Sequence, residues 1–226
     1  MSERMVAIAW PPGAAQGLAL EGLHLPPAAG AAGAEAPLAG AVIAPPHPLY
    51  GGSMENPVVS ELAVAAARAG LASLRFNWRG VGASPGRASG DAEDARADYG
   101  AALAHLAEGV DGTLVACGYS FGACAAVAAT RIGEGAPPYL VRVRRLLLVA
   151  PPPSLLDAGA LRAFRGEVLV VAAERDAIAP PSALEALAGS LGRGAFELVP
   201  EADHFFGAGL PELGRAAAGF MRRAAG

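Results

Sequence analysis

Short apolar runs alternate along this chain with longer stretches of mixed character. Six runs predict strands: Leu38–Ala44, Leu71–Phe76, Thr113–Cys117, Leu146–Ala150, Val168–Ala172 and Phe196–Val199. Most of these runs are continuous rather than alternating, which indicates strands that are buried on both faces of a parallel sheet. A further segment, Gly17–Leu25, predicts an edge strand.

The stretches between these runs carry signals for helices. Asn56 and Pro57 provide an N-cap and a first helical residue for a helix that closes at Gly70. Further helices are predicted at Asp91–Glu108, at Phe121–Ile132, from a capping-box match at Ser182–Glu185, and from Pro211 to near Arg223. The low-complexity residues 26–37 predict a loop.

Strands and helices therefore alternate, as they do in βαβ units. This order predicts an α/β fold with a mostly parallel central sheet flanked by helices, in a single domain that spans residues 1–226. In such sheets the active site lies at the carboxyl ends of the strands. The loops that follow the strands are therefore the expected location of the chemistry.

Composition narrows the function classes. The formal net charge is −4, and this slightly acidic balance argues against a nucleic-acid-binding surface. All 17 basic residues are arginine, and we expect Arg142, Arg144 and Arg145 to form a solvated edge rather than an anion site. The chain has no run of 18 apolar residues that would predict a membrane span, and its N-terminal apolar run is too short for a secretory signal. The two cysteines form no disulfide framework and fit no zinc spacing without added ligands, so we expect no metal site. We also expect no cofactor and a cytoplasmic location.

Two segments match the nucleophile motif G-x-S-x-G, and their contexts differ. The segment Gly118–Gly122 follows a predicted strand and opens a predicted helix, so Ser120 has the setting that a nucleophile elbow needs. The segment Gly82–Gly86 opens no helix, and its Pro85 lacks the N–H that must follow a nucleophile to stabilise an oxyanion. We therefore predict Ser120 as a nucleophile and Ser84 as a turn residue.

A serine nucleophile needs a base, and the base needs an acid that orients it. His204 is the only histidine after Ser120, and it lies in the loop after the last predicted strand. Asp176 follows the preceding strand and lies further into its loop than Glu174, so we predict Asp176 as the acid. Asp203 adjoins His204 in sequence and is expected to stabilise the loop locally.

An oxyanion hole needs two backbone donors, and the residue after the nucleophile, Phe121, is predicted to supply the first. The second is expected from residues 45–52, whose three prolines have no N–H. Leu49 is the first usable donor near His47 and Tyr50 is the next, while the His47 side chain can orient the loop. Three aromatic side chains beside these positions are expected to contact the substrate: Tyr50, Tyr119 and Phe205.

These segments together resemble the small bacterial α/β-hydrolases without a lid, which are related to the dienelactone-hydrolase-like esterases. The resemblance rests on His47–Met54, Arg75–Gly82, Gly118–Gly122, Glu174–Asp176 and Asp203–Phe206. It implies an α/β-hydrolase fold, a triad of Ser120, Asp176 and His204, and an oxyanion hole made by the Phe121 and Leu49 amides. Only residues 151–166 lie between Ala150 and Glu167, where a helical lid would be inserted, so we expect no substantial lid.

The sequence thus predicts a serine hydrolase, most directly a carboxylesterase that acts on small or short-chain esters through an acyl-enzyme. Two alternatives stay open. One is an amidase or peptidase with the same triad, and the other is a non-catalytic binding protein on the same scaffold. The predicted partner is a small ester, but the loops carry mostly alanine, glycine and proline and select no acyl group. The sequence also indicates no oligomeric state.

Overall fold

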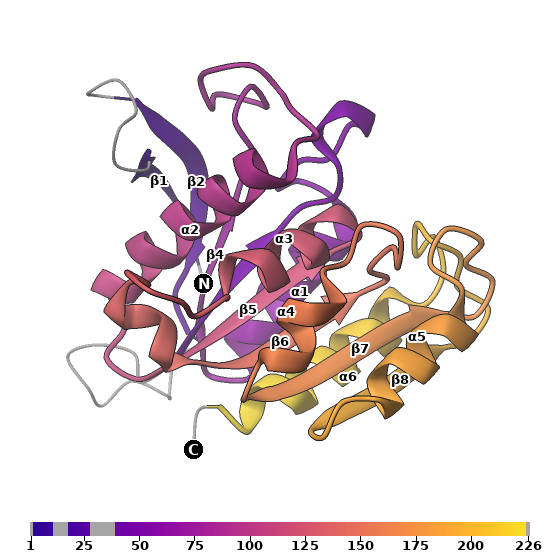
Figure 1. Ribbon diagram of the computed structural model, residues 1–226. Helices are drawn as coiled ribbons and strands as arrows, with labels where there is room; N and C mark the ends of the chain where they lie inside the picture. The colour runs from indigo at the N-terminus through magenta and orange to yellow at the C-terminus, as the bar shows by residue number, and fades with distance from the viewer. Residues whose placement is uncertain (1, 11–17, 28–38, 225–226) are drawn as a thin grey trace.

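A mixed sheet of eight strands runs through the molecule in the order β1-β2-β4-β3-β5-β6-β7-β8 (Figure 1). The computed structural model describes residues 2–10, 18–27 and 39–224. The strands are β1 (Arg4–Ala9), β2 (Ala19–Leu25), β3 (Ala39–Ala44), β4 (Ala72–Phe76), β5 (Thr113–Tyr119), β6 (Val143–Val149), β7 (Glu167–Ala173) and β8 (Gly194–Val199). Strands β3 to β8 are mutually parallel, whereas β2 runs antiparallel to both β1 and β4. The predicted α/β fold with a mostly parallel sheet is confirmed.

Helices cover both faces of this sheet. They are α1 (Pro57–Arg68), α2 (Ala92–Glu108), α3 (Phe121–Ala129), α4 (Ala158–Ala163), α5 (Pro181–Gly189) and α6 (Leu210–Arg222), with short 3-10 turns η1 (Pro48–Tyr50) and η2 (Pro138–Arg142). Helices α1 and α6 pack together behind the sheet in Figure 1, and α2 and α3 pack together in front of it. Among the helices described, none combines the length and the apolar character that a bilayer crossing requires.

Two helices begin where the sequence predicts, and two predicted helix ends differ from the structure. The Asn56 side chain accepts a hydrogen bond from the Val58 N–H, and Asp91 caps α2 in the same way. The capping box predicted at Ser182 is wrong, because α5 already includes Ser182: it begins at Pro181, a proline whose fixed φ suits the first helical position. Helix α3 ends at Ala129 rather than Ile132, where the Thr130 hydroxyl donates back to main-chain carbonyls.

The edges of the sheet differ from the prediction more than its centre does. Strands β3 to β7 are buried almost throughout, as their continuous apolar runs predict. The strand predicted at the edge of the sheet is β2, but β2 lies between β1 and β4, and β1 forms the edge. The sequence does not predict β1, because Ile8 is its one buried residue and the strand therefore has no continuous apolar run. Gly17, Leu38 and residues 28–37 of the predicted loop lie outside the described residues.

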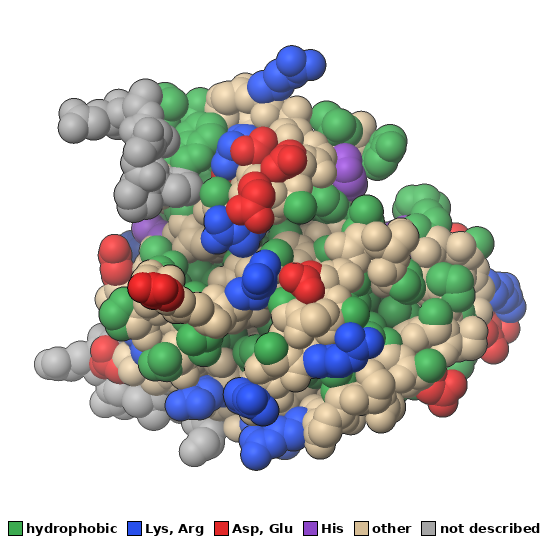
Figure 2. Space-filling view, in the orientation of Figure 1, with side chains coloured by type: hydrophobic (Ala, Val, Ile, Leu, Met, Phe, Trp, Pro, Cys, Tyr) green, Lys and Arg blue, Asp and Glu red, His purple; other side chains and the backbone are tan. Residues whose placement is uncertain are grey.

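Arginines gather at the amino ends of the parallel strands, where the preceding helices end. Arg142 donates to the carbonyls of Ala107 and Gly112, at 3.1 and 3.0 Å, and to that of Val110. Arg145 is buried and pairs with Glu167. The prediction of a solvated edge is therefore wrong for these two residues and holds for Arg144, which is exposed. Figure 2 shows basic side chains along the lower edge of the view, where β6 and β7 begin in Figure 1.

Candidate active site

Ser120 occupies the sharp turn between β5 and α3. Its backbone adopts φ 54° and ψ −121°, a positive-φ conformation that strains a residue with a side chain. The Ser120 N–H donates to the Val149 carbonyl at 2.8 Å, which ties the turn to β6. A Cβ atom on Gly118 would overlap the Gly122 carbonyl, and one on Gly122 would overlap the carbonyls of Ala44 and Pro45, so both motif positions require glycine.

Three predicted side chains meet beside this turn. The Oγ of Ser120 lies 3.0 Å from Nε2 of His204, and Nδ1 of His204 lies 2.7 Å from Oδ2 of Asp176. The Asp176 side chain is completely buried, and its Oδ1 accepts hydrogen bonds from the N–H groups of Ile178 and Ala179. Because the Asp176 carboxylate accepts a hydrogen bond from Nδ1 of His204, a neutral His204 carries its proton on Nδ1, and its Nε2 can accept from the serine hydroxyl.

The loop that carries His204 is held by Tyr119. The Tyr119 hydroxyl donates to the His204 carbonyl at 2.6 Å. Burial and then the nearby Asp176 and Asp203 carboxylates raise the pKa of Tyr119, so the hydroxyl keeps its proton as a donor. The expected substrate contact of Tyr119 conflicts with its position, because Tyr119 is only 2% exposed and its hydroxyl is engaged with the His204 carbonyl.

Backbone contacts fix the loops after β7 and β8 against each other. The Arg175 N–H donates to the Ala202 carbonyl at 2.8 Å, and the Glu201 N–H donates to the Glu174 carboxylate at 2.7 Å. Glu174, the weaker candidate for the acid, therefore serves the loop. Asp203 accepts from the Phe205 N–H at 3.0 Å, which is the local role predicted for it.

The loop after β3 uses its amides differently from the prediction. The Leu49 N–H donates to Nδ1 of His47 at 3.2 Å, and the Tyr50 N–H donates to the His47 carbonyl at 3.1 Å. Both candidate donors for an oxyanion are therefore engaged within the loop. In the part of the chain that the structure describes, the N–H of His47 has no hydrogen-bond partner. The sequence already carries a signal for this donor, because His47 is the only residue of Pro45–Pro48 that has a backbone N–H.

The His47 side chain anchors this loop to the elbow. Its ring lies 4.6 Å from the Phe121 ring, and the Trp78 indole N–H donates to the Pro46 carbonyl at 2.9 Å. Burial lowers the pKa of His47, and its Nδ1 must be unprotonated to accept from the Leu49 amide. The neutral imidazole therefore orients the loop, as the sequence suggested.

Other nucleophiles near the elbow are inert or structural. Burial raises the pKa of Cys117, and it raises the pKa of Cys124 to about 12, so both thiols are protonated at neutral pH. Ser84 of the second motif is buried, where its Oγ accepts from the Glu21 N–H and donates to the Asn77 carbonyl, each at 2.9 Å. Its predicted role as a turn residue fits these contacts.

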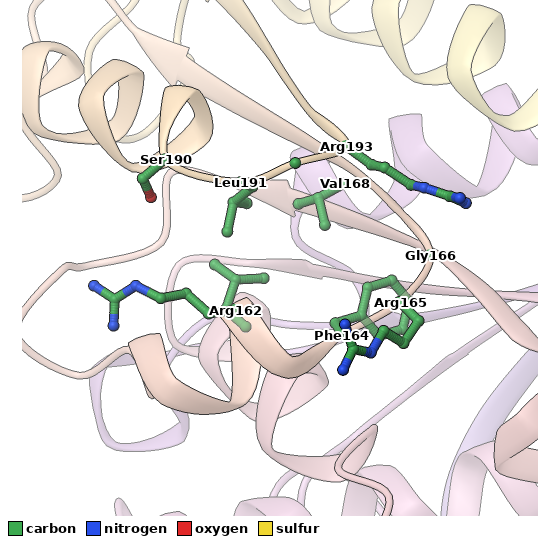
Figure 3. A pocket seen from close by; sticks show the side chains of 10 residues that line it. Arg162, Phe164, Arg165, Gly166, Val168, Ser190, Leu191 and Arg193 are labelled. Atoms are coloured by element: carbon green, nitrogen blue, oxygen red, sulfur yellow. The ribbon is translucent and has the colours of Figure 1, made fainter.

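Apolar side chains are exposed on the loops that neighbour the Ser120 turn. Leu49, Tyr50 and Phe205 are exposed on the neighbouring loops, and only the short helix α4 lies between β6 and β7. A hollow of about 440 Å³ lies elsewhere, at the amino ends of β7 and β8 (Figure 3). Its wall includes Arg162, Arg165 and Arg193 and none of the three residues that meet at the elbow.

Comparison with known proteins identifies the fold. No protein-family model matches the sequence, and no curated protein matches it. A homologue of α/β serine hydrolases from Coxiella burnetii shares 28% identity, with TM-score 0.77 over 97% of this chain and 98% of the other. An α/β serine hydrolase without a lid from Xanthomonas campestris shares 26% identity, with TM-score 0.77 over 99% and 95%.

A third structure is the esterase domain of a Rhodothermus marinus protein. It shares 18% identity, with TM-score 0.71 over the whole of both chains, and supports the fold alone. The predicted α/β-hydrolase fold, and the predicted resemblance to its members without a lid, are therefore confirmed.

Proposed function

We propose that this chain, which has the fold of the α/β serine hydrolases, is a serine hydrolase that cleaves carboxylic esters of small molecules. One observation carries the proposal. Three loops that are far apart in sequence bring Ser120, His204 and Asp176 into one chain of hydrogen bonds, at 3.0 and 2.7 Å. This arrangement is the one that activates a serine hydroxyl as a nucleophile.

The reaction starts with attack by the Ser120 oxygen on the ester carbonyl carbon. As the new C–O bond forms, the carbonyl π electrons move to the oxygen and the hydroxyl proton passes to Nε2 of His204. The buried Asp176 carboxylate stabilises the imidazolium. The imidazolium then protonates the departing alkoxide, which leaves an acyl-enzyme, and water repeats the sequence to release the acid and regenerate Ser120.

The oxyanion needs donors that are fixed before the reaction. We assign these to the backbone N–H groups of Phe121 and His47. Phe121 follows the nucleophile at the first residue of α3, where the helix leaves N–H groups unpaired. The His47 N–H is supported by its lack of a partner in the described structure and by the contact of its ring with Phe121. Leu49, the donor implied by the resemblance, is occupied by its bond to His47.

Steady-state hydrolysis of p-nitrophenyl acetate and butyrate tests the proposal. Ser120→Ala should lower kcat/KM by at least about 10⁴-fold, because the nucleophile is removed. Ser84→Ala is the matched control from the second G-x-S-x-G segment and should retain activity. Equal activity of Ser120→Ala and wild type would overturn the proposal. The matching p-nitroanilides separate an esterase from an amidase with the same triad.

A further inference from the structure

Exposed apolar side chains gather at the edge of the sheet where Ser120 lies. Large hydrophobic side chains are costly to solvate, and a cluster of them on the solvent-exposed surface of a protein marks a contact site. Five of these exposed side chains lie on loops that follow β3, β6, β7 and β8: Leu49, Tyr50, Leu155, Ile178 and Phe205. In Figure 2 the molecular outline is indented between the loops at the top of the view and the lobe at the right, and hydrophobic side chains occupy both sides.

Two aromatic rings in this group flank the triad from opposite sides. The Tyr50 ring lies 4.7 Å from the His47 ring, which contacts Phe121 of the elbow. The Phe205 ring lies 5.7 Å from the His204 ring and nearly perpendicular to it. Strand β5, which leads to Ser120, lies between β3 on the Tyr50 side and β6 to β8 on the Phe205 side. Apolar surface is therefore available on both sides of the nucleophile.

The exposure of Phe205 is built into its loop. The side chain is 72% exposed, although the next residue, Phe206, is only 1% exposed. The Phe205 N–H is held by Asp203, and Phe206 adopts φ 52°, so the backbone is fixed with one phenylalanine inward and the other outward. The loop buries the Phe206 ring against Tyr119 and presents the Phe205 ring beside His204, where a ligand can reach it.

The chemistry of the triad decides which part of an ester reaches Phe205. His204 must protonate the departing alkoxide, so the alcohol portion lies on the histidine side of the carbonyl carbon. The oxyanion lies toward the Phe121 and His47 amides. The acyl portion then extends on the remaining side, toward the loop that carries Leu49 and Tyr50.

We propose that Phe205 is the specificity-determining contact for an apolar or aromatic alcohol portion of the ester, and that Tyr50 serves the acyl portion. The preferred substrates are then esters that are apolar on both sides of the carboxyl group. This assignment rests on the proposed esterase function and specifies its substrate class. Both rings act by covering apolar substrate surface, so their effect is on binding rather than on proton transfer.

The test compares pairs of esters that differ on one side only. Benzyl acetate and ethyl acetate share an acyl group, and ethyl 3-phenylpropanoate and ethyl acetate share an alcohol. Wild type should prefer benzyl acetate to ethyl acetate in kcat/KM by about tenfold, the effect of covering part of an aromatic ring. Phe205→Ala should abolish this preference, mainly through KM, and Phe205→Leu should restore part of it. Tyr50→Ala should instead reduce the preference for the phenylpropanoate.

Ile132→Ala is the control, because Ile132 is similarly exposed and lies after α3 rather than on these loops. It should leave both preferences unchanged. A Phe205→Ala variant that loses activity equally on benzyl and ethyl acetate, or keeps the benzyl preference, overturns the assignment while the esterase function stands. A folded wild type that hydrolyses none of the three esters overturns the proposed function and the assignment together.

Discussion

The two ends of the parallel sheet use their polar side chains in different ways. At the amino ends of the strands, Arg142 and Arg145 bind backbone carbonyls and Glu167, so their charges close helix ends and tie strands together. At the carboxyl ends, Ser120, His204 and Asp176 bind one another. In the described structure, every non-glycine residue with positive φ also lies at the carboxyl ends: Ser120, Ala150, Glu201 and Phe206.

This difference separates stabilising groups from functional ones. A buried polar group that binds the main chain lowers the free energy of the fold. Backbone strain opposes folding, and it persists only where the surroundings enforce it, most often at functional sites. The carboxyl ends therefore hold strained backbone together with the side chains that we propose to be reactive, and the rest of the molecule supports both. Substitutions at the carboxyl ends of the strands should therefore lower activity, and substitutions at the amino ends should lower the free energy of unfolding.

Among the substitutions that test this comparison, the largest effect is expected from Asp176→Asn. The asparagine amide would donate where the carboxylate accepts, which favours the wrong tautomer of His204 and removes the charge that stabilises its imidazolium. Ester kcat should fall by about 10⁴-fold. Steady-state kinetics measures the loss, and circular dichroism checks that the variant is folded. A loss below tenfold in a folded variant would contradict the role given to Asp176.

Arg142→Met should have the opposite signature. Removing its guanidinium leaves the carbonyls of Ala107, Val110 and Gly112 without this donor, and the unfolding free energy should fall by about 1–3 kcal/mol. Urea denaturation measures this change, and kcat/KM should stay at the wild-type value. Arg144→Met is the matched control, since Arg144 is exposed, and it should change neither quantity. A loss of activity without a loss of stability would break the contrast between the two ends.

Two buried tyrosines, Tyr119 at the end of β5 and Tyr99 on α2, sharpen the comparison. Tyr119→Phe removes the hydrogen bond to the His204 carbonyl, and kcat should fall by about tenfold because the histidine loop loses its anchor. Tyr99→Phe removes a buried hydroxyl that donates to the Val42 and Cys117 carbonyls. It should lower thermal stability and leave kcat unchanged. The interpretation of Tyr119 as a positioning residue fails if both variants lose only stability.

The smallest effect is expected from acidification. Burial lowers the pKa of His47, and burial together with Arg4 and His105 lowers the pKa of His24, from the ordinary value of 6.5. Below that value the unfolded chain binds protons that the folded chain does not, so stability is highest above pH 6.5 and falls as the pH decreases through it. Urea unfolding at several pH values measures the slope, and His24→Gln should reduce it. An unchanged slope in that variant would contradict the role of His24.

The sequence predicts the centre of this molecule better than its margins. Continuous apolar runs identify strands that are buried on both faces, but β1 hides only Ile8 and gives no such run. The three positions that we propose as a triad lie in loops after predicted strands, and the choice of histidine follows from the order of the chain, since one histidine follows Ser120. The amide of Leu49 was misjudged because its partner is a side chain two residues away, a contact that spacing alone does not reveal. Tyr119 was predictable: it precedes the elbow on a buried strand, where its side chain faces inward.

Covalent labelling tests the central claim most directly. The folded protein is treated with a fluorophosphonate, and intact mass and peptide mapping locate the adduct. If the Ser120, His204 and Asp176 side chains form an activated nucleophile, wild type and Ser84→Ala should each gain one adduct on Ser120, whereas Ser120→Ala should gain none. A folded wild type that stays unlabelled, or carries its adduct on another residue, would contradict the account and favour a binding protein on a hydrolase scaffold.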